Sequence, residues 1–597
     1  MESQSTAAGT LIAGRYRVIR SLARGGMGEV VHCVDMSRGR DVALKQLHTA
    51  GDGEIDQLFL REATALASLD HPNLARALDF GFTEGQGRYL VMDFVEGLSL
   101  AQIIEQHSVL PWDLLATIAD QLLAGLAYLH ARGIVHRDIK PANLMLGNTD
   151  EALRVTIVDL GLAAFRDHAL IELGGQKPEL LANVGRYATP PYCAPEQLLR
   201  HPMFQGPTTD LHAVGVTLYL LCHGRLPYAG ADEAALITAL LRKPPAPFVP
   251  VNAAPMEVGP IVRRLVAKKP WDRYDFAVTV RQELAPLWSY DAGLSAWRTL
   301  RRGLKSAVAP VKRAQPVEPA TGRSSLSVSE LLTLRVAHLY GRAGEQRRLW
   351  EAATAVTSGE TRLIALEGEA GVGKSRLAQW LAEQVHERGL MRALHISCGP
   401  GGGALQGVLG AIERHFGFGE APRALVERAL VGRWGRENEA TRLARALAGI
   451  LRPEDLEEEQ RGAHSAHQQS VLAEPGSDEV RAQTILEVVQ RIAGDRPLLL
   501  WIDDLPRADD ETLTLIRLLL EAQQNALVLL TGRTQQLAAE AESGAPTILQ
   551  RYCQEHGGEL IALSPLARSE LKEMLRALLR SDDDVDGKGV EEVLYRA

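Results

Sequence analysis

The sequence contains little cysteine. Five cysteines occur among 597 residues, without paired spacing: Cys33, Cys193, Cys222, Cys398 and Cys553. A sparse and odd set of this kind provides neither a disulfide framework nor a zinc-binding pattern. The thiols are typical of a reducing compartment.

Long apolar segments are also missing. The N-terminus, Met1 to Gln4, is polar and shows no apolar core of a signal peptide. No uninterrupted apolar run approaches the roughly 18–20 residues that a bilayer-spanning helix needs. We therefore expect no membrane span and a cytoplasmic location.

No charge of one sign dominates the chain. It has 65 basic and 74 acidic residues, which gives a net charge of −9. This mild balance argues against a dedicated nucleic-acid-binding protein, so we expect no nucleic-acid partner. The length of 597 residues is too great for one core and indicates roughly two to four domains.

Hydrophobic patterning divides the chain into consecutive parts. Residues 13–290 begin with period-2 runs typical of strands and continue with helical patterns, which indicates a two-lobed α+β enzyme. Residues 291–335 are basic and contain Pro, Ser and Thr, which predicts a linker. In residues 336–555, strand and helix patterns alternate as in an α/β nucleotide-binding fold.

A glycine-rich segment opens a series of ordered motifs in the first half. It runs from Leu22 to Val30 and includes Gly25 and Gly28. Glycines let the backbone approach phosphates and offer N–H groups to them, and Val30 follows directly. Ala23 stands where the first glycine of such a loop usually lies, so we expect a weaker affinity for ATP at most.

Two charged residues follow at the spacing of a phosphate-binding site. Lys45 closes a Val-Ala-Leu-Lys strand run, where its ammonium would contact the α- and β-phosphates. Glu62 lies on a predicted helix and is the natural ion-pair partner of Lys45. A lone exposed Lys/Glu pair would be a surface salt bridge of little worth, but these two stand in order within the series.

The most specific motif is a His-Arg-Asp-Ile-Lys-Pro-Ala-Asn-Leu run that starts at His136. Phosphoryl transfer asks a protein mainly for positioning and charge neutralisation. Asp138 would orient the substrate hydroxyl and accept its proton, and Lys140 would neutralise charge at the γ-phosphate. Asn143 and the later Asp159, which begins Asp-Leu-Gly, would bind magnesium.

On these motifs, residues 13–290 resemble the bacterial Hanks-type serine/threonine protein kinases. The resemblance extends to an Ala-Pro-Glu motif ending at Glu196, to its usual partner Arg273, and to a helix starting at Asp210 that braces the catalytic loop in this family. It implies ATP and Mg²⁺ as cofactors, Ser/Thr-containing proteins as substrates, and a non-specific serine/threonine protein kinase. The implied adenine-contacting residues are Asp93 and Val95.

The segment between the Asp-Leu-Gly and Ala-Pro-Glu motifs departs from the family pattern. Its only hydroxyl residues are Tyr187, Thr189 and Tyr192. Thr189 fits the substrate-facing threonine, so no evident Ser/Thr acceptor for an activating phosphate is left. We therefore hypothesise that the C-terminal half, rather than loop phosphorylation, controls the first half; a glutamate in the loop is the alternative source of negative charge.

A second nucleotide motif lies in the C-terminal half. An apolar strand pattern runs into a Gly-x-x-x-x-Gly-Lys-Ser segment, and a helical pattern follows. This context predicts a P-loop, in which the backbone from Gly368 to Gly373 holds phosphates. Lys374 would bridge the β- and γ-phosphates, and Ser375 would bind magnesium.

Two further apolar strand patterns end in charged residues. The first ends at Asp503 and Asp504 and reads as a Walker B strand, in which Asp503 would support magnesium and Asp504 would polarise water. The second ends near Arg533, a candidate detector of the γ-phosphate. An exposed arginine that merely follows a strand is an equally good interpretation of Arg533.

Residues 336–597 resemble the AAA-type ATPase modules of the STAND class, through Tyr340-Gly341-Arg342 and the run from Leu563 to Leu566. The resemblance implies a P-loop NTPase fold, a second ATP site and homo-oligomerisation through this module. Residues 556–597 would be the start of a helical lid, partial because the chain ends near where related lids continue. The run from Leu505 to Arg507 departs from relatives, which leaves open whether the module hydrolyses ATP or binds it as a switch.

Three functions fit these patterns. The leading one is a protein serine/threonine kinase regulated by its ATPase module. The second is a pseudokinase scaffold that acts through a nucleotide-dependent switch, which the intact motif residues disfavour. The third is a small-molecule kinase, which Lys140 and the Ala-Pro-Glu motif disfavour.

Overall fold

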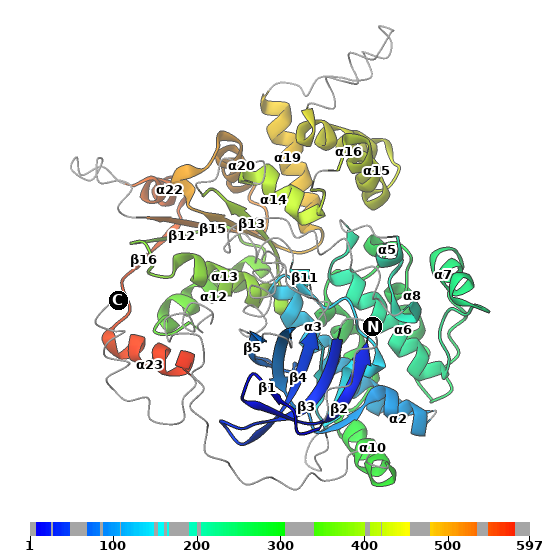
Figure 1. The fold of residues 1–597 in the computed structure, drawn as a ribbon. Helices are drawn as coiled ribbons and strands as arrows, with labels where there is room; N and C mark the ends of the chain where they lie inside the picture. The colour runs from blue at the N-terminus through cyan, green and yellow to red at the C-terminus, as the bar shows by residue number, and fades with distance from the viewer. Residues whose placement is uncertain are drawn as a thin grey trace. The chain divides into compact units, whose positions relative to one another are not determined.

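The chain forms two compact units (Figure 1). Unit 1 comprises residues 1–338 and 574–597, and unit 2 comprises residues 339–573. This computed structural model describes residues 8–25, 28–47, 69–83, 87–107, 109–147, 153–159, 164–165, 190–199, 204–304, 339–399, 406–419, 421–453, 478–533 and 547–579.

Unit 1 begins with an antiparallel sheet of six strands in the order β1-β2-β3-β4-β6-β5. Apolar residues at alternate positions, such as Val31, Val42 and Leu44, pack into a small core on one face. The predicted strand lobe is therefore present. The strands are β1 (Leu11–Ile12), β2 (Tyr16–Gly25), β3 (Gly28–Asp35), β4 (Arg40–Leu47), β5 (Ala77–Thr83) and β6 (Gly87–Asp93).

The rest of unit 1 is a helical lobe built around α3. Helix α3 is apolar almost all round, and residues such as Leu114, Leu115 and Leu123 are fully buried. Its length and composition would also suit a membrane span, but 78% of its apolar window is buried inside the protein. The helices are α2 (Leu100–Gln106), α3 (Trp112–Ala131), α5 (Pro195–Leu198), α6 (Pro207–His223), α7 (Glu233–Arg242), α8 (Val258–Leu265), α9 (Ala277–Leu284) and α10 (Tyr290–Gly303).

Helix α10 lies where the sequence predicted the first part of a linker. Trp297 is only 1% exposed, and α10 packs closely on α3, since a Cβ on Gly293 would lie 2.1 Å from the Thr117 hydroxyl. The arginines that suggested a tether, such as Arg298 and Arg302, lie on the exposed face. The sequence reasoning relied on charge and composition and overlooked apolar residues, spaced three or four apart, that pack on this core: Leu294, Trp297, Leu300 and Leu304. Residues 305–335 lie outside the described residues.

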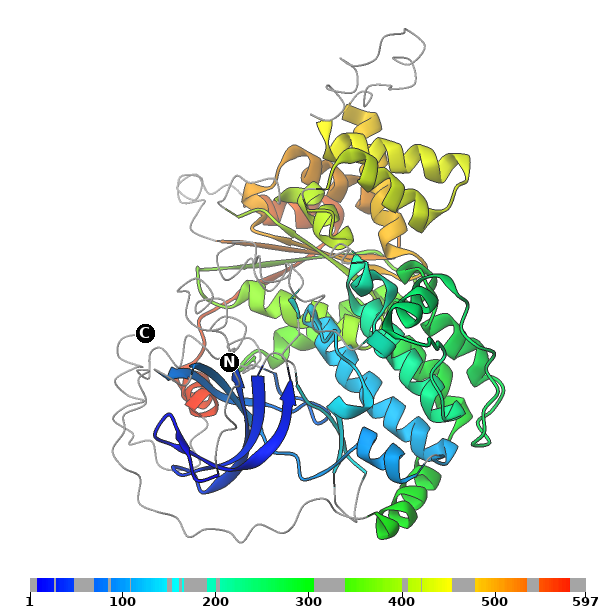
Figure 2. The same ribbon diagram turned by 45° about the vertical axis from the view of Figure 1, so that its right-hand side comes forward.

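Unit 2 is built on a parallel sheet of five strands in the order β13-β14-β15-β12-β16. The central strands read as continuous apolar runs because helices cover both faces. Helices α12 and α13 lie on one face, and α14, α20 and α22 lie on the other (Figures 1 and 2). The strands are β12 (Arg362–Gly368), β13 (Arg392–Ser397), β14 (Leu498–Asp503), β15 (Ala526–Arg533) and β16 (Glu559–Leu563).

The connections between these strands run to one side of β12 first and to its other side later in the chain. The two strands that follow β12 in sequence lie beyond β15, whereas β16 pairs with its other edge. Ligands of such sheets bind outside the carboxyl ends of the strands at this switch point. The helices of unit 2 are α12 (Ala343–Thr357), α13 (Lys374–Glu387), α14 (Gly407–Phe416), α15 (Arg423–Trp434), α16 (Asn438–Leu451), α19 (Asp478–Ala493), α20 (Asp510–Glu521) and α22 (Ile548–His556). Helix α23 (Arg568–Leu579) begins in unit 2, and its residues from Met574 are assigned to unit 1.

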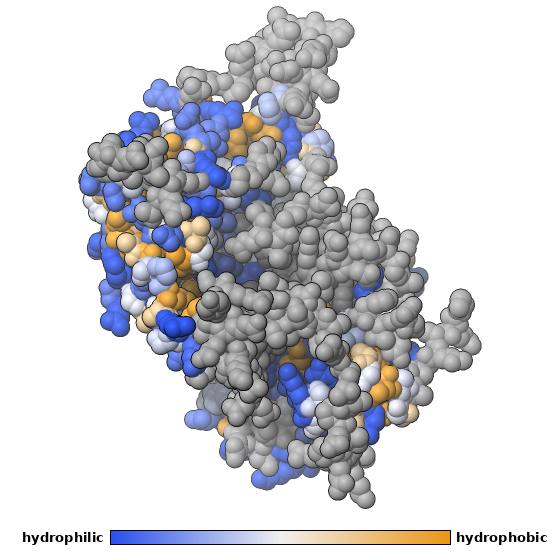
Figure 3. Space-filling model, turned by 60° about the vertical axis from the view of Figure 1, so that its left-hand side comes forward, coloured by the Kyte–Doolittle hydropathy of each residue, from blue (hydrophilic) through white to orange (hydrophobic). Residues whose placement is uncertain are grey.

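Hydrophobic side chains are interspersed with hydrophilic ones on the coloured surface in Figure 3. Large apolar residues that are exposed include Leu11 and Leu22. Single exposed apolar residues are normal on folded proteins and require no partner.

The buried tryptophan of α10 gives a test of this fold. Trp297→Ala should lower the free energy of unfolding of unit 1 by about 3–5 kcal/mol, because it opens a large cavity against α3. Tyr290→Ala, at the exposed start of the same helix, should change it by less than about 0.5 kcal/mol. Urea unfolding measures both, and equal small effects would contradict the docking of α10.

Candidate functional site

The catalytic-loop residues come together between β8 (Ile134–Val135) and β9 (Leu144–Gly147). Lys140 Nζ lies 2.8 Å from Asp138 Oδ2. Asn143 Nδ2 donates to the backbone oxygen of Asp138 at 2.8 Å and to its Oδ2 at 3.0 Å. An amide and an ammonium therefore converge on one carboxylate and fix its direction.

The next pair joins the strand lobe to the end of β10 (Val155–Ile157). Lys45, on β4, is 7% exposed and forms an ion pair with Asp159. Asp159 has a φ of 62°, a left-handed conformation that is uncommon for residues other than glycine. The structure thus brings Lys45 and Asp159 together, whereas Glu62, the predicted partner of Lys45, lies outside the described residues.

The described part of the glycine-rich segment lies at the end of β2 and the start of β3. Gly25 pairs with Gly28, and Val30 lies opposite Lys45 on the neighbouring strand. These residues therefore belong to the same sheet region as the lysine.

The predicted adenine-contacting segment begins at the end of β6. Asp93 pairs with Val42 of β4, and its carboxylate accepts a 2.8 Å hydrogen bond from Arg76 Nε. The Asp93 carboxylate is therefore engaged by Arg76, and the contact of Asp93 and Val95 with adenine stays a prediction.

A buried carboxylate braces the catalytic loop from beneath. Asp210, in the first turn of α6, accepts hydrogen bonds from the backbone N–H groups of His136 at 2.9 Å and Arg137 at 2.8 Å. His130 Nε2 lies 2.8 Å from the same carboxylate. Burial alone would raise the pKa of Asp210, but the hydrogen bonds from His130 and His136 outweigh it and lower that pKa. The bracing role predicted for this helix is confirmed.

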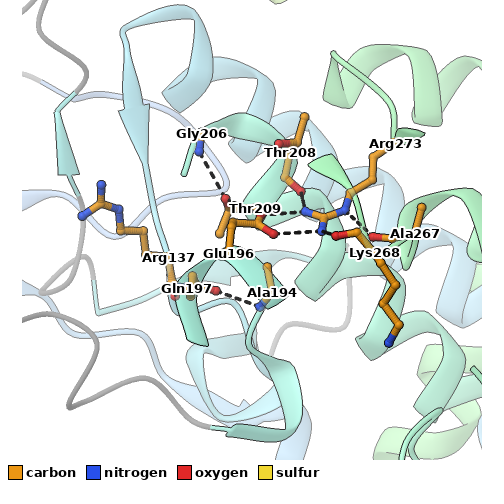
Figure 4. Close-up of polar contacts among 10 residues, drawn as sticks. All are labelled: Arg137, Ala194, Glu196, Gln197, Gly206, Thr208, Thr209, Ala267, Lys268 and Arg273. Carbon is orange, nitrogen blue, oxygen red and sulfur yellow. Dashed lines mark hydrogen bonds and ion pairs between the residues drawn. The ribbon is translucent and has the colours of Figure 1, made fainter. Parts of the chain in front are cut away.

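A buried ion pair closes the activation segment, as predicted (Figure 4). Arg273 Nη1 and Nη2 lie 2.7 and 2.9 Å from the two oxygens of Glu196. Its remaining donors reach the backbone oxygens of Ala267 and Thr208 at 2.7 and 3.0 Å, and Thr209 Oγ1 donates to Glu196 at 2.9 Å. Both ions are almost fully buried, so each requires the other.

In unit 2, the turn between β12 and α13 forms one wall of a cleft of about 420 Å³. Gly371 and Gly373 have φ values of 81° and 93°, which favour glycine. Lys374 begins α13, so the helix N-terminus faces the cleft. The cleft is lined by Ala370, Gly371, Gly373, Lys374, Ser375, Arg376, Ser397, Gly399, Asp503, Asp504, Thr531, Gly532 and Arg533.

Asp503 is the centre of the polar contacts in this cleft. Its Oδ1 accepts hydrogen bonds from Ser375 Oγ at 2.8 Å and from Thr531 Oγ1 at 2.6 Å. The Thr531 hydroxyl in turn accepts the N–H of Asp504 at 3.0 Å. Thr531 was missed by the sequence reasoning, which considered only Arg533 on this strand. A hydroxyl residue at the end of the strand that flanks β14 was the available signal.

Lys374 is held by the turn itself. Its Nζ donates to the backbone oxygens of Gly368 and Glu369 at 2.9 and 2.7 Å. Burial, together with the charge of Arg533, lowers the pKa of Lys374. The surroundings thus disfavour an unpaired ammonium, and an anionic ligand would relieve this cost. Residue Arg342 supports the turn from behind, because its Nη2 donates to Val372 O at 3.0 Å.

The donor atoms fit magnesium carried by a nucleotide better than a resident metal ion. Among the described residues, no three His, Cys, Asp or Glu side chains are grouped to hold a metal. Mg²⁺ instead takes one or two protein oxygens together with phosphates and water. The pairs Asn143 with Asp159 and Ser375 with Asp503 offer oxygens of this kind.

A strand lobe and a helical lobe that share a braced Asp-Lys-Asn loop define a protein kinase domain, and comparison with known families agrees. Residues 16–282 match the family described as protein kinase domain, and residues 338–531 match the AAA ATPase domain. The chain therefore combines a protein kinase domain with an AAA ATPase domain.

Its relatives are bacterial serine/threonine-protein kinases. PknA of Mycobacterium tuberculosis is 34% identical over 272 residues, which are 45% of this chain and 59% of PknA. Pkn1 of Myxococcus xanthus is 34% identical over 350 residues, 58% of this chain and 48% of Pkn1. PknD of Chlamydia pneumoniae is 30% identical over 334 residues, 51% of this chain and 35% of PknD. The chain thus spans about a third to three fifths of the length of these relatives.

The ion pair of Glu196 with Arg273 gives a test of how the activation segment is held. Glu196→Gln leaves a buried guanidinium without its counter-ion and should cost about 3–5 kcal/mol of unfolding free energy. Replacing both partners by apolar residues, with Glu196→Leu and Arg273→Met together, should cost far less. Denaturant unfolding of the single and double variants measures the difference. Additive losses in the double variant would contradict the pairing.

Proposed function

We propose that unit 1 is an ATP-dependent protein serine/threonine kinase. The observation that carries this proposal is the cluster of Asp138, Lys140 and Asn143, fixed from beneath by Asp210. Relatives named as serine/threonine-protein kinases support the class. The proposed domain spans residues 13–290, extended by α10.

When bound, MgATP supplies the γ-phosphoryl group and the charge neutralisation at its phosphates. Asp138 would orient the substrate hydroxyl and accept its proton, and Lys140 and Asn143 fix the direction of its carboxylate. Lys140 would neutralise charge at the γ-phosphate, and Lys45, which is paired with Asp159, would contact the α- and β-phosphates. Asn143 and Asp159 offer oxygens to magnesium.

The remaining nucleotide contacts come from the strand lobe. Backbone N–H groups around Gly25 and Gly28 would meet the phosphates, and Val30 of the same hairpin would contact the nucleotide. The main chain of Asp93 and Val95 would hold the adenine. Substrates are Ser- or Thr-containing proteins, and a cytoplasmic location suits the thiols.

The proton acceptor gives the first functional test. Asp138→Asn keeps the shape of the side chain but removes its basicity, so phosphoryl transfer should fall by about 100- to 10,000-fold. The measurement is transfer of labelled phosphate from ATP to a generic basic protein. Asp120→Asn, a surface aspartate on α3 that pairs with Arg281, is the matched control and should retain activity. Transfer that survives Asp138→Asn would overturn the assignment.

We propose that unit 2 is a P-loop ATPase module of the STAND type. Residues 336–555 were predicted as its core and 556–597 as a partial lid, but β16 (Glu559–Leu563) pairs with β12 in the core sheet, so the proposed core extends to Leu563 and the proposed lid begins after it. The module binds a second ATP and regulates unit 1, in part by forming homo-oligomers. Lys374 and Ser375 hold phosphates and magnesium next to Asp503, and Asp504 and Arg533 line the same cleft. The Thr531 hydroxyl contacts both aspartates, because it donates to the Asp503 carboxylate and accepts the N–H of Asp504.

The second site gives a separate test. Lys374→Ala should reduce bound nucleotide from two per chain to one, because it removes the cation that faces the phosphates. The control is Lys243, an exposed lysine at the C-terminal end of α7. Lys243→Ala should leave both sites occupied. Equilibrium dialysis counts the bound nucleotide, and a kinase assay on the same variants reports regulation. Two nucleotides on Lys374→Ala would contradict the P-loop, and unchanged phosphoryl transfer would contradict regulation by unit 2.

A further inference from the structure

The backbone of Arg137 is held in an unusual conformation directly before Asp138. Its φ is 68°, in the left-handed region that residues with a side chain rarely adopt. Such a conformation persists only where the surroundings hold it. Because Arg137 immediately precedes Asp138, its dihedral angles set the direction in which the Asp138 side chain leaves the loop.

Both peptide groups of Arg137 are engaged by residues from outside the loop. Its N–H donates to Asp210 Oδ1 at 2.8 Å. Its carbonyl oxygen accepts a 2.9 Å hydrogen bond from Gln197 Nε2. Asp210 comes from helix α6, whereas Gln197 comes from α5, at the end of the activation segment. Two elements therefore hold the conformation of the loop. One is helix α6, and the other is the segment that includes the Ala-Pro-Glu motif.

Gln197 is itself fixed on its other side. Its Oε1 accepts the N–H of Ala194 at 2.9 Å, which caps the start of α5. The side chain is 6% exposed, and the adjacent Glu196 is locked by Arg273. Figure 4 shows Gln197 between Ala194 and Arg137. One amide thus acts as acceptor toward the activation segment and as donor toward the catalytic loop, through its carbonyl oxygen and its NH₂ group respectively.

We propose that Gln197 is a positioning residue for phosphoryl transfer. It holds the Arg137 carbonyl, and through it Asp138, so that the geometry of the catalytic loop depends on the seating of the end of the activation segment. The proposal rests on the kinase function of unit 1. It assigns Gln197 an effect on the transfer step and none on nucleotide binding.

Two substitutions separate the donor from the acceptor. Gln197→Met has a similar shape and removes both hydrogen bonds, whereas Gln197→Glu keeps the acceptor for Ala194 but has a donor only when its carboxyl is protonated. The matched control is Gln102→Ala in α2, since Gln102 makes the same kind of cap, with Ser99, without contacting the catalytic loop. All variants are made in the full chain and compared with wild type.

For Gln197→Met, kcat should fall by about tenfold or more, as expected when a buried hydrogen bond is lost, while KM for ATP stays within about twofold. Gln102→Ala should leave kcat unchanged. For Gln197→Glu, kcat relative to wild type should recover as the pH is lowered from about 8 to about 6, because burial raises the pKa of the introduced carboxyl and its protonated form can donate. The same ratio should stay flat for Gln197→Met.

The outcomes distinguish the inference from the function on which it rests. A wild-type chain that transfers no phosphate would remove the kinase function itself. An active wild type with unchanged kcat in Gln197→Met would overturn the positioning role alone. A fall in kcat that Gln102→Ala reproduces, or that comes with an equal rise in KM for ATP and no pH-dependent recovery in Gln197→Glu, would show a structural role and also overturn it.

Discussion

The carboxylate of Asp210 is the group on which the catalytic loop depends. It is 1% exposed, so its charge is stable only because His130 and two backbone N–H groups surround it. Those N–H groups belong to residues just before Asp138, so the same bonds that keep the buried charge stable also fix the loop. Removing the carboxylate would leave several donors unsatisfied in the core, which is costly. The stability of this lobe and the geometry of the catalytic loop thus both depend on the Asp210 carboxylate.

Unit 2 repeats this principle with different residues. Asp503 lies at the end of β14, where hydroxyl groups from α13 and β15 both donate hydrogen bonds to one of its oxygens. Since β15 separates β12 from β14 in the sheet, the contact requires the strand order as well as the motif. The geometry of the cleft therefore depends on the correct order of the strands in the sheet.

The sequence was sufficient for residues whose chemistry is local to a motif. The run that contains Asp138, Lys140 and Asn143, and the turn before Lys374, could be recognised because neighbouring residues act together. The partners that contact them come from distant elements, so these contacts depend on the fold: Gln197 reaches Arg137 from α5, and Thr531 reaches Asp503 from β15. Helix α10 was missed for a different reason: its segment was read by charge and composition, although apolar residues recur in it every three or four positions and pack on the core of unit 1, namely Leu294, Trp297, Leu300 and Leu304.

The most direct measurement of the central claim is the identity of the amino acid that receives phosphate. The purified chain is incubated with labelled ATP, Mg²⁺ and a protein substrate, and the hydrolysed product is separated into phosphoamino acids. The account predicts labelled phosphoserine or phosphothreonine that requires Mg²⁺. ATP binding without any labelled phosphoamino acid would contradict it and would favour a scaffold that uses nucleotide only as a switch.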